Sequence, residues 1–189
     1  MMSTVKIIRG KCLIIGDSTV GKSTITQLFC SDGQNLFKNY SMTTGVDILT
    51  KLVPVPESNF SVEIVFYDCA GKECFYNIVQ KTWDHPGMVI VVFDLTNDVS
   101  FSTALKWLDR VRSLRSDIKI PVVLIGNKLD LSMRRNVKQE DISDFCRKND
   151  TAYFECSAKE NQGVTEAVMH LVKQYYDLYK DCLNEFQNL

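Results

Sequence analysis

Apolar and polar positions follow one another along this 189-residue chain in an order that predicts strands and helices in turn. Three short runs, 12–15, 88–93 and 122–125, are continuously apolar, as expected of central strands covered on both faces of a parallel sheet. In the segments 101–112 and 164–179, apolar residues recur every three or four positions, which predicts amphipathic helices. Asn97 and Ser100 are suitable caps for the first of these helices.

Two further segments, 47–55 and 61–67, are typical of a hairpin at a sheet edge. Pro54 and Pro56 lie near its turn, and proline has no N–H to donate to a strand ladder. The alternation of strand and helix signals predicts an α/β fold, with a parallel sheet between two helical layers. The length and the 45% hydrophobic content suit one domain, although length alone would allow two small ones.

Charge gives no reason to expect a nucleic-acid or membrane partner. The 22 basic and 23 acidic residues nearly cancel, so the chain has no excess charge that would attract a polyanion. Two local groups of arginines are expected to be solvated faces. They are Arg110, Arg112 and Arg115, and then Arg134 and Arg135.

The seven cysteines are scattered and form no C-x-x-C pair, which favours reduced thiols in an intracellular, cytoplasmic protein over a disulfide framework or a zinc site. The first ten residues lack the apolar core of a signal peptide. No apolar run is long enough to span a bilayer, so we expect a soluble protein.

A glycine-rich pattern, G-x-x-x-x-G-K-S, directly follows the first apolar run and precedes a helix-like run to residue 30. Two glycines let successive backbone N–H groups converge on an anion, and the following helix adds its positive end. Lysine then reaches the β- and γ-phosphates, and the serine hydroxyl ligates Mg²⁺. A plain turn with an exposed lysine is the alternative. The predicted phosphate contacts are Gly16, Asp17, Ser18, Thr19, Val20, Gly21, Lys22, Ser23 and Thr24.

A second motif, Asp68-Cys69-Ala70-Gly71, closes the apolar stretch before it. A carboxylate at a strand end can hold Mg²⁺ through water, and the Gly71 N–H is placed to meet a γ-phosphate. By itself the pattern D-x-x-G is equally typical of an ordinary turn.

Two later motifs select the base. Asn127-Lys128-Leu129-Asp130 follows a buried strand, and its last carboxylate can accept the N1–H and exocyclic amine of guanine, a donor pair that adenine lacks. Asn127 can join the loops, and the Lys128 stem can cover the base. Ser157-Ala158-Lys159 supplies backbone N–H groups for the guanine carbonyl oxygen and a second lysine for its other face. A P-loop nucleoside kinase would have no use for the last two of these four motifs, so the sequence disfavours that class of enzyme.

These motifs resemble those of the Ras superfamily of small GTPases, and the likeness runs from about Lys11 to Tyr179. The segments T-T-G-V-D and F-D-L-T-N are similar to the Rab branch. The resemblance implies a P-loop NTPase fold with a mostly parallel six-stranded sheet, one antiparallel edge strand and helices on both faces. It also implies GTP or GDP with Mg²⁺, held by Ser23, Thr43 and, through water, Asp68. Domain 1–189 would then bind GTP and carry a helical extension after about residue 179.

Three longer segments are similar to a narrower family, the Rab-like GTPase subunits of the intraflagellar transport B complex. They are SMTTGVDILTKLVPVPES, YDCAGKECF and VFDLTNDVSF. This resemblance implies a place in the cilium or flagellum and at its base. It also implies a small β-sandwich partner among the other subunits of the complex.

Lys72 departs from the family pattern, which has a water-orienting glutamine after Gly71. An ammonium only donates hydrogen bonds, so we expect slow GTP hydrolysis. The alternative is that Lys72 neutralises transition-state charge, as an arginine finger does. Cys182 is too far from the end for prenylation and residue 2 is Met, so we expect no direct lipid anchor. A cycling Rab-type switch and a constitutive GTP-bound subunit both remain open.

Overall fold

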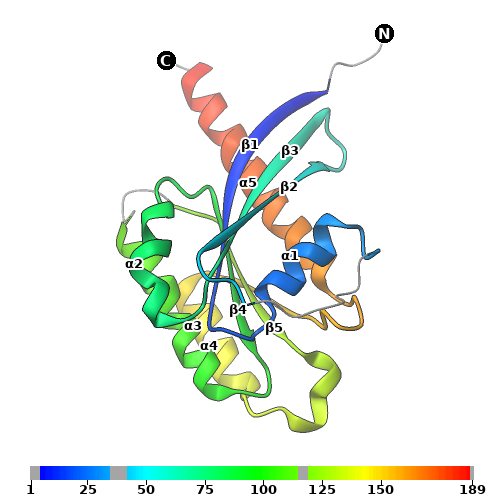
Figure 1. Cartoon of the computed structure of the whole chain (residues 1–189). Helices are drawn as coiled ribbons and strands as arrows, with labels where there is room; N and C mark the ends of the chain where they lie inside the picture. Colours follow the sequence, from blue (N-terminus) through cyan, green and yellow to red (C-terminus); the bar gives the residue numbers. More distant parts are fainter. Residues whose placement is uncertain (1–4, 35–41, 115–118, 188–189) are drawn as a thin grey trace.

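The computed structural model describes residues 5–34, 42–114 and 119–187, with the side chains of 186 and 187 left out. Six strands form one sheet in the order β2-β3-β1-β4-β5-β6 (Figure 1). β2 runs antiparallel to β3, and the remaining neighbours are parallel. The predicted fold class is therefore confirmed. The strands are β1 Lys6–Ile15, β2 Val46–Pro54, β3 Phe60–Cys69, β4 Met88–Asp94, β5 Val122–Asn127 and β6 Ala152–Glu155.

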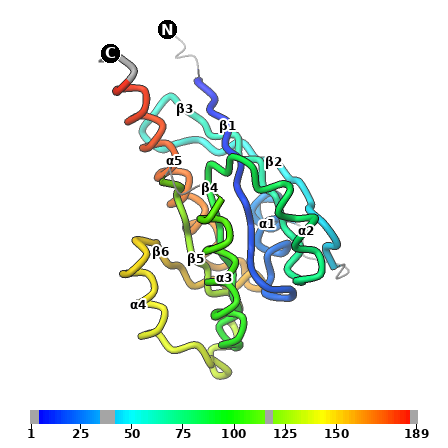
Figure 2. Tube along the Cα trace, turned by 90° about the vertical axis from the view of Figure 1, so that its left-hand side faces the viewer, coloured from blue at the N-terminus to red at the C-terminus, as the bar shows by residue number. Residues whose placement is uncertain are grey.

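Helices cover both faces of this sheet, as the continuously apolar strands β4 and β5 require. One core cluster joins the sheet to α1 and α5, and the other joins it to α2, α3 and α4. The traces in Figure 1 and Figure 2 show this layered arrangement. The helices are α1 Lys22–Cys30, α2 Tyr76–Val79, α3 Asp98–Leu114, α4 Gln139–Asn149 and α5 Val164–Gln187. The short 3-10 segments in the described ranges are η1 Glu73–Phe75, η2 Gln80–Thr82 and η3 Leu129–Arg134.

The predicted hairpin and helix cap are both present. β2 and β3 pair from Val46 opposite Cys69 to Pro54 opposite Ser61, which leaves β2 at the edge of the sheet. At the start of α3, the Ser100 backbone N–H donates to the Asn97 side chain at 3.2 Å. This bond satisfies one of the free N–H groups of the first helical turn.

Arg110 and Arg112 are half-buried, so these two arginines are less solvated than we predicted. Arg110 donates to both carboxylate oxygens of Glu73, at 2.9 and 2.6 Å. Arg112 donates to the side chain of Asn149 at 2.6 Å, and Arg135 forms a two-point contact with Glu155. These guanidinium groups connect elements that are distant in sequence, because their planar forks match carboxylate and amide oxygens. Arg134 and Arg135 are exposed as expected, and Arg115 lies outside the described residues.

The ends of β1, β3, β4 and β5 bring the polar motifs to one edge of the sheet. The carboxyl ends of parallel strands share an edge, and ligands of open α/β sheets bind there. α5 continues to Gln187, beyond the end of the family resemblance (Figure 1). In the part of the chain that the structure describes, no helix combines the length and apolar character needed to cross a bilayer.

Candidate nucleotide-binding site

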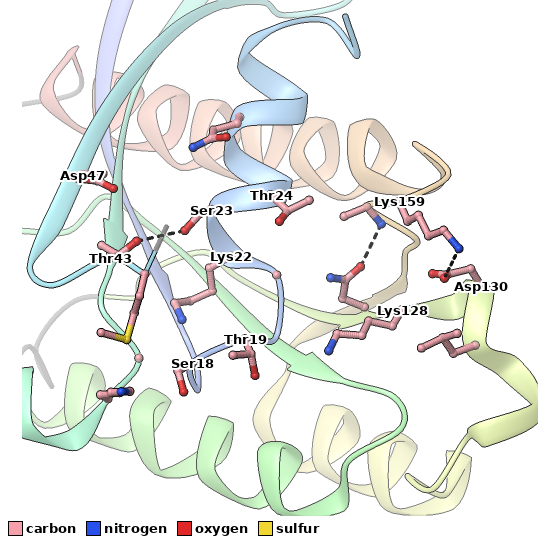
Figure 3. A pocket seen from close by; sticks show the side chains of 18 residues that line it. Ser18, Thr19, Lys22, Ser23, Thr24, Thr43, Asp47, Lys128, Asp130 and Lys159 are labelled. Atoms are coloured by element: carbon pink, nitrogen blue, oxygen red, sulfur yellow. Dashed lines mark hydrogen bonds and ion pairs between the residues drawn. The ribbon is translucent and has the colours of Figure 1, made fainter. Parts of the chain in front are cut away.

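A cavity of about 900 Å³ lies at this edge of the sheet, where the loops that carry the four motifs meet (Figure 3). Among the described residues, eighteen line the cavity, and fourteen of these were predicted from the sequence. They are Ser18, Thr19, Gly21, Lys22, Ser23, Thr24, Thr43, Gly71, Lys72, Asn127, Lys128, Asp130, Ala158 and Lys159. The other four, which the motifs did not indicate, are Gln27, Met42, Asp47 and Leu131.

Five predicted residues do not line the cavity but support those that do. Gly16 lies directly against the backbone of β4, and Val20 is buried. Asp17 offers its backbone oxygen to Lys22. Asp68 and Ser157 are buried polar residues next to the cavity wall. The contiguous motifs therefore mix contact residues with residues that hold the loops in shape.

Lys22 places a nearly buried ammonium at the cavity. Its side chain leaves the first turn of α1, and the residue is 6% exposed. The Nζ donates to the Asp17 carbonyl oxygen at 2.6 Å. Burial lowers the pKa of Lys22, and the nearby Asp68 carboxylate opposes that shift. A buried cation that faces a polar cavity favours an anionic ligand.

Ser23, Thr43 and Asp68 form an oxygen-rich corner beside this ammonium. The Ser23 and Thr43 hydroxyls are 3.2 Å apart (Figure 3). Asp68 Oδ1 is buried and has no hydrogen-bond partner within the described ranges. Burial raises the pKa of Asp68, while Ser23, Lys22 and Thr43 lower it. An orphaned carboxylate oxygen beside two hydroxyls is a hard-oxygen donor set of the kind that suits Mg²⁺.

Asn127 joins the three loops around the cavity. Its Nδ2 donates to the Val20 carbonyl oxygen at 2.8 Å, and its Oδ1 accepts the Ala158 N–H at 3.0 Å. The residue is 3% exposed. The expected role of Asn127 as a connector is therefore visible. The Ala158 N–H donates to Asn127 in this structure. A hydrogen bond from this N–H to a base oxygen stays a prediction.

Asp130 presents a fixed carboxylate to the cavity. The Ser157 hydroxyl donates to Asp130 Oδ1 at 2.7 Å, and Lys159 Nζ lies 3.7 Å from Oδ2 (Figure 3). Its side chain is only 7% exposed. Carboxylate oxygens have spare lone pairs, so Asp130 retains the capacity to accept two further N–H groups.

Gly71 and Lys72 also line the cavity. A Cβ built on Gly71 would lie 2.4 Å from the backbone nitrogen of Ser18, so only glycine allows this approach to the phosphate loop. Lys72 follows in extended conformation, is exposed and lines the cavity. The next residue, Glu73, is held on α3 by its two bonds to Arg110.

Aromatic contacts extend this attachment to α3. The Arg110 guanidinium lies 4.4 Å from the ring centre of Tyr76 and 5.0 Å from that of Trp107. Tyr76 also packs edge-on against Trp83. The segment that follows Lys72 is thus fixed to the body of the fold by one ion pair and a cluster of rings.

Comparison with known families matches residues 11–177 to the Ras family. The chain is 42% identical over 180 residues to the intraflagellar transport protein 27 homolog of Mus musculus, covering 95% of this chain and 96% of the relative. It is 30% identical over 185 residues to intraflagellar transport protein 27 of Chlamydomonas reinhardtii, covering 96% and 91%. It is 33% identical over 163 residues to the Ras-related protein RabC of Dictyostelium discoideum, covering 86% and 82%.

Proposed function

The chain belongs to the Ras family, and on that premise we propose that it is a Rab-like GTP-binding subunit of the intraflagellar transport B complex that hydrolyses GTP slowly. The observation that carries the catalytic part is Lys72 at the cavity beside Gly71. The relatives named for intraflagellar transport support the assignment to the complex. The same relatives support a role in ciliary or flagellar trafficking, and our proposal places the protein in the cilium or flagellum and at its base.

The residues around the cavity fit a guanine nucleotide with Mg²⁺. Lys22 and the loop N–H groups would hold the phosphates, while Ser23, Thr43 and, through water, Asp68 would hold the metal ion. Bound Mg²⁺ would neutralise phosphate charge. Asp130 would accept the donor pair of guanine, and Lys128 and Lys159 would cover its faces. The orphaned Asp68 oxygen is the feature that a cation would satisfy.

Slow hydrolysis follows from what Lys72 lacks. A water molecule that attacks phosphorus needs an acceptor for one of its protons, and a glutamine side chain offers a carbonyl oxygen for this. The Lys72 ammonium has three donors and no acceptor. A cation near the γ-phosphate stabilises bound GTP without aligning the water, so the site favours retention of GTP over its turnover.

Replacing Lys72 by glutamine is expected to raise single-turnover GTP hydrolysis about tenfold, from a wild-type rate no faster than the order of 10⁻⁴ s⁻¹. The amide restores an acceptor for the attacking water. Phosphate release from preloaded GTP measures both rates. Lys81→Gln makes the same change at an exposed lysine outside the cavity lining and should leave the rate unchanged. A fast wild-type enzyme that Lys72→Gln slows would instead make Lys72 a stabiliser of transition-state charge.

The attachment of Glu73 and Tyr76 to α3 supports a constitutive role in the complex. A segment held by Arg110, which does not line the cavity, depends less on which nucleotide is bound. Thr43 next to Ser23, together with Gly71 against the phosphate loop, favours the second candidate, a conventional cycling Rab-type switch. The proposed direct partner is the small β-sandwich subunit of the same complex.

The affinity for this partner is expected to differ less than about threefold between the GDP form and a form loaded with a non-hydrolysable GTP analogue. Equal affinity means that binding does not shift a conformational equilibrium. Titration calorimetry with protein of verified nucleotide content gives both dissociation constants. A difference above about tenfold would favour the cycling switch.

A further inference from the structure

Asp94 and Lys128 meet behind the cavity wall, although they come from different strands. Asp94 is the last residue of β4 and pairs in register with Asn127, the last residue of β5. Lys128 follows with a left-handed backbone, φ 69°. Its Nζ lies 2.6 Å from Asp94 Oδ2, and the two side chains are 32% and 10% exposed. Asp94 belongs to the Rab-like segment F-D-L-T-N, but the sequence predicts no role for the Asp94 side chain.

The Asp94 carboxylate is itself fixed. Its Oδ1 accepts the Thr96 backbone N–H at 2.8 Å and the Thr96 hydroxyl at 2.7 Å. Its backbone N–H donates to the Ser100 hydroxyl at 3.0 Å. Burial opposes ionisation, yet Lys128 and Thr96 hold the pKa of Asp94 below its usual range. The acceptor opposite the Lys128 ammonium is therefore a charged and immobile group.

Lys128 lines the cavity, whereas Asp94 does not. A lysine side chain has four rotatable stem bonds, so holding it in one conformation costs conformational entropy. The ion pair with Asp94 orders the Lys128 side chain before a ligand binds, so the ligand does not have to order it. The methylene stem is then left along the cavity wall, on the side where Asp130 also faces the cavity (Figure 3).

We propose that Asp94 is a positioning residue for the guanine nucleotide: it anchors the Lys128 ammonium so that the lysine stem forms a preordered wall for the base. Thr96 orients Asp94 for this task. The inference rests on the proposed function, because it requires that the cavity holds a guanine nucleotide. It predicts equal weakening of GDP and GTP when the anchor is lost, because both contain the same base. Selectivity for guanine over hypoxanthine should persist, because Asp130 is unchanged.

The test is the dissociation rate of a fluorescent GDP, chased with excess unlabelled GDP at fixed Mg²⁺. Asp94→Asn keeps the shape of the side chain, and with its amide oxygen on the Thr96 N–H it turns the amide NH2 group toward the Lys128 ammonium. We expect about tenfold faster release of GDP and of a GTP analogue. In a Lys128→Met background, the same substitution should change release less than twofold, because the group it acts through is gone.

Controls separate positioning from a general loss of stability. Asp144→Asn removes an exposed carboxylate that pairs with Arg147 and should leave the release rate unchanged. Thr96→Val keeps the ion pair but removes one bond to Asp94, and we expect release to quicken two- to threefold. The second variant also keeps the test decisive if Asp94→Asn does not fold.

Three outcomes would overturn the proposal. Release from Asp94→Asn within twofold of wild type would show that the anchor has no effect. If Asp94→Asn speeds GDP release by the same factor in the wild-type and Lys128→Met backgrounds, the role of Asp94 is purely structural. Wild-type protein that binds no fluorescent GDP would overturn the proposed function and this inference together, so failure of one is distinguishable from failure of both.

Discussion

Substituting Asp130 by asparagine is expected to lower the affinity for GDP by about a thousandfold or more, because a site built to pair with a base's N–H groups rejects a mismatched partner strongly. The carboxylate is 7% exposed and is held by Ser157, so it has little freedom to rearrange. An asparagine amide would turn one donor toward the donors of guanine. That leaves buried N–H groups unpaired, at the cost of their full desolvation.

The same substitution should improve binding of xanthosine diphosphate, whose base carries an oxygen where guanine has an amine. The new amide N–H would then have an acceptor. Competition of each nucleotide against a fluorescent diphosphate measures the reversal. Asp84→Asn alters an exposed carboxylate paired with Lys11 and serves as the matched control. Unchanged preference for GDP in Asp130→Asn would show that this carboxylate does not read the base.

Sequence patterns predicted the central strands because burial there is almost complete, and the long helices because their apolar residues recur at helical spacing. Every residue of β4 and of β5 is buried, so the apolar runs are uninterrupted. α4 escaped prediction for the opposite reason. Its residues Gln139–Asn149 have only Ile142 buried, and one buried position gives no helical period. β1 begins at Lys6, six positions before the predicted run, because its first half alternates between exposed and buried residues.

The candidate site was predictable where its residues are contiguous. The phosphate loop and the Asn127–Asp130 turn are local motifs with fixed spacing, and they line the same cavity. The pairs Asp94 with Lys128 and Glu73 with Arg110 were not predicted, because they depend on strand register and helix docking. Neither strand register nor helix docking produces a residue period or a fixed motif spacing that could be recognised in the sequence. The contacts that half-bury Arg110 and Arg112 were not predicted for the same reason.

Adding one methyl group to the phosphate loop, Gly21→Ala, is expected to weaken GDP binding on the order of a hundredfold, equivalent to about 3 kcal/mol. Gly21 has φ 104°, and a non-glycine residue there is strained by about 1–3 kcal/mol. A Cβ would also lie 2.1 Å from Asn127 Nδ2. Displacing that amide breaks its bonds to Val20 and Ala158, each worth about 1 kcal/mol.

Gly45→Ala provides a control in the same chain, because a Cβ there meets no atom within 4 Å and its φ is not positive. We expect Gly45→Ala to retain GDP like wild type and Gly21→Ala to be purified largely without nucleotide. Nucleotide content after purification and the rise in melting temperature with added GDP measure both variants. Gly21→Ala within threefold of the wild-type affinity would mean that the Asn127 connection between the three loops is dispensable. Loss of binding in Gly21→Ala alone would show that the phosphate loop requires glycine here, both for its positive φ and for its close contact with Asn127.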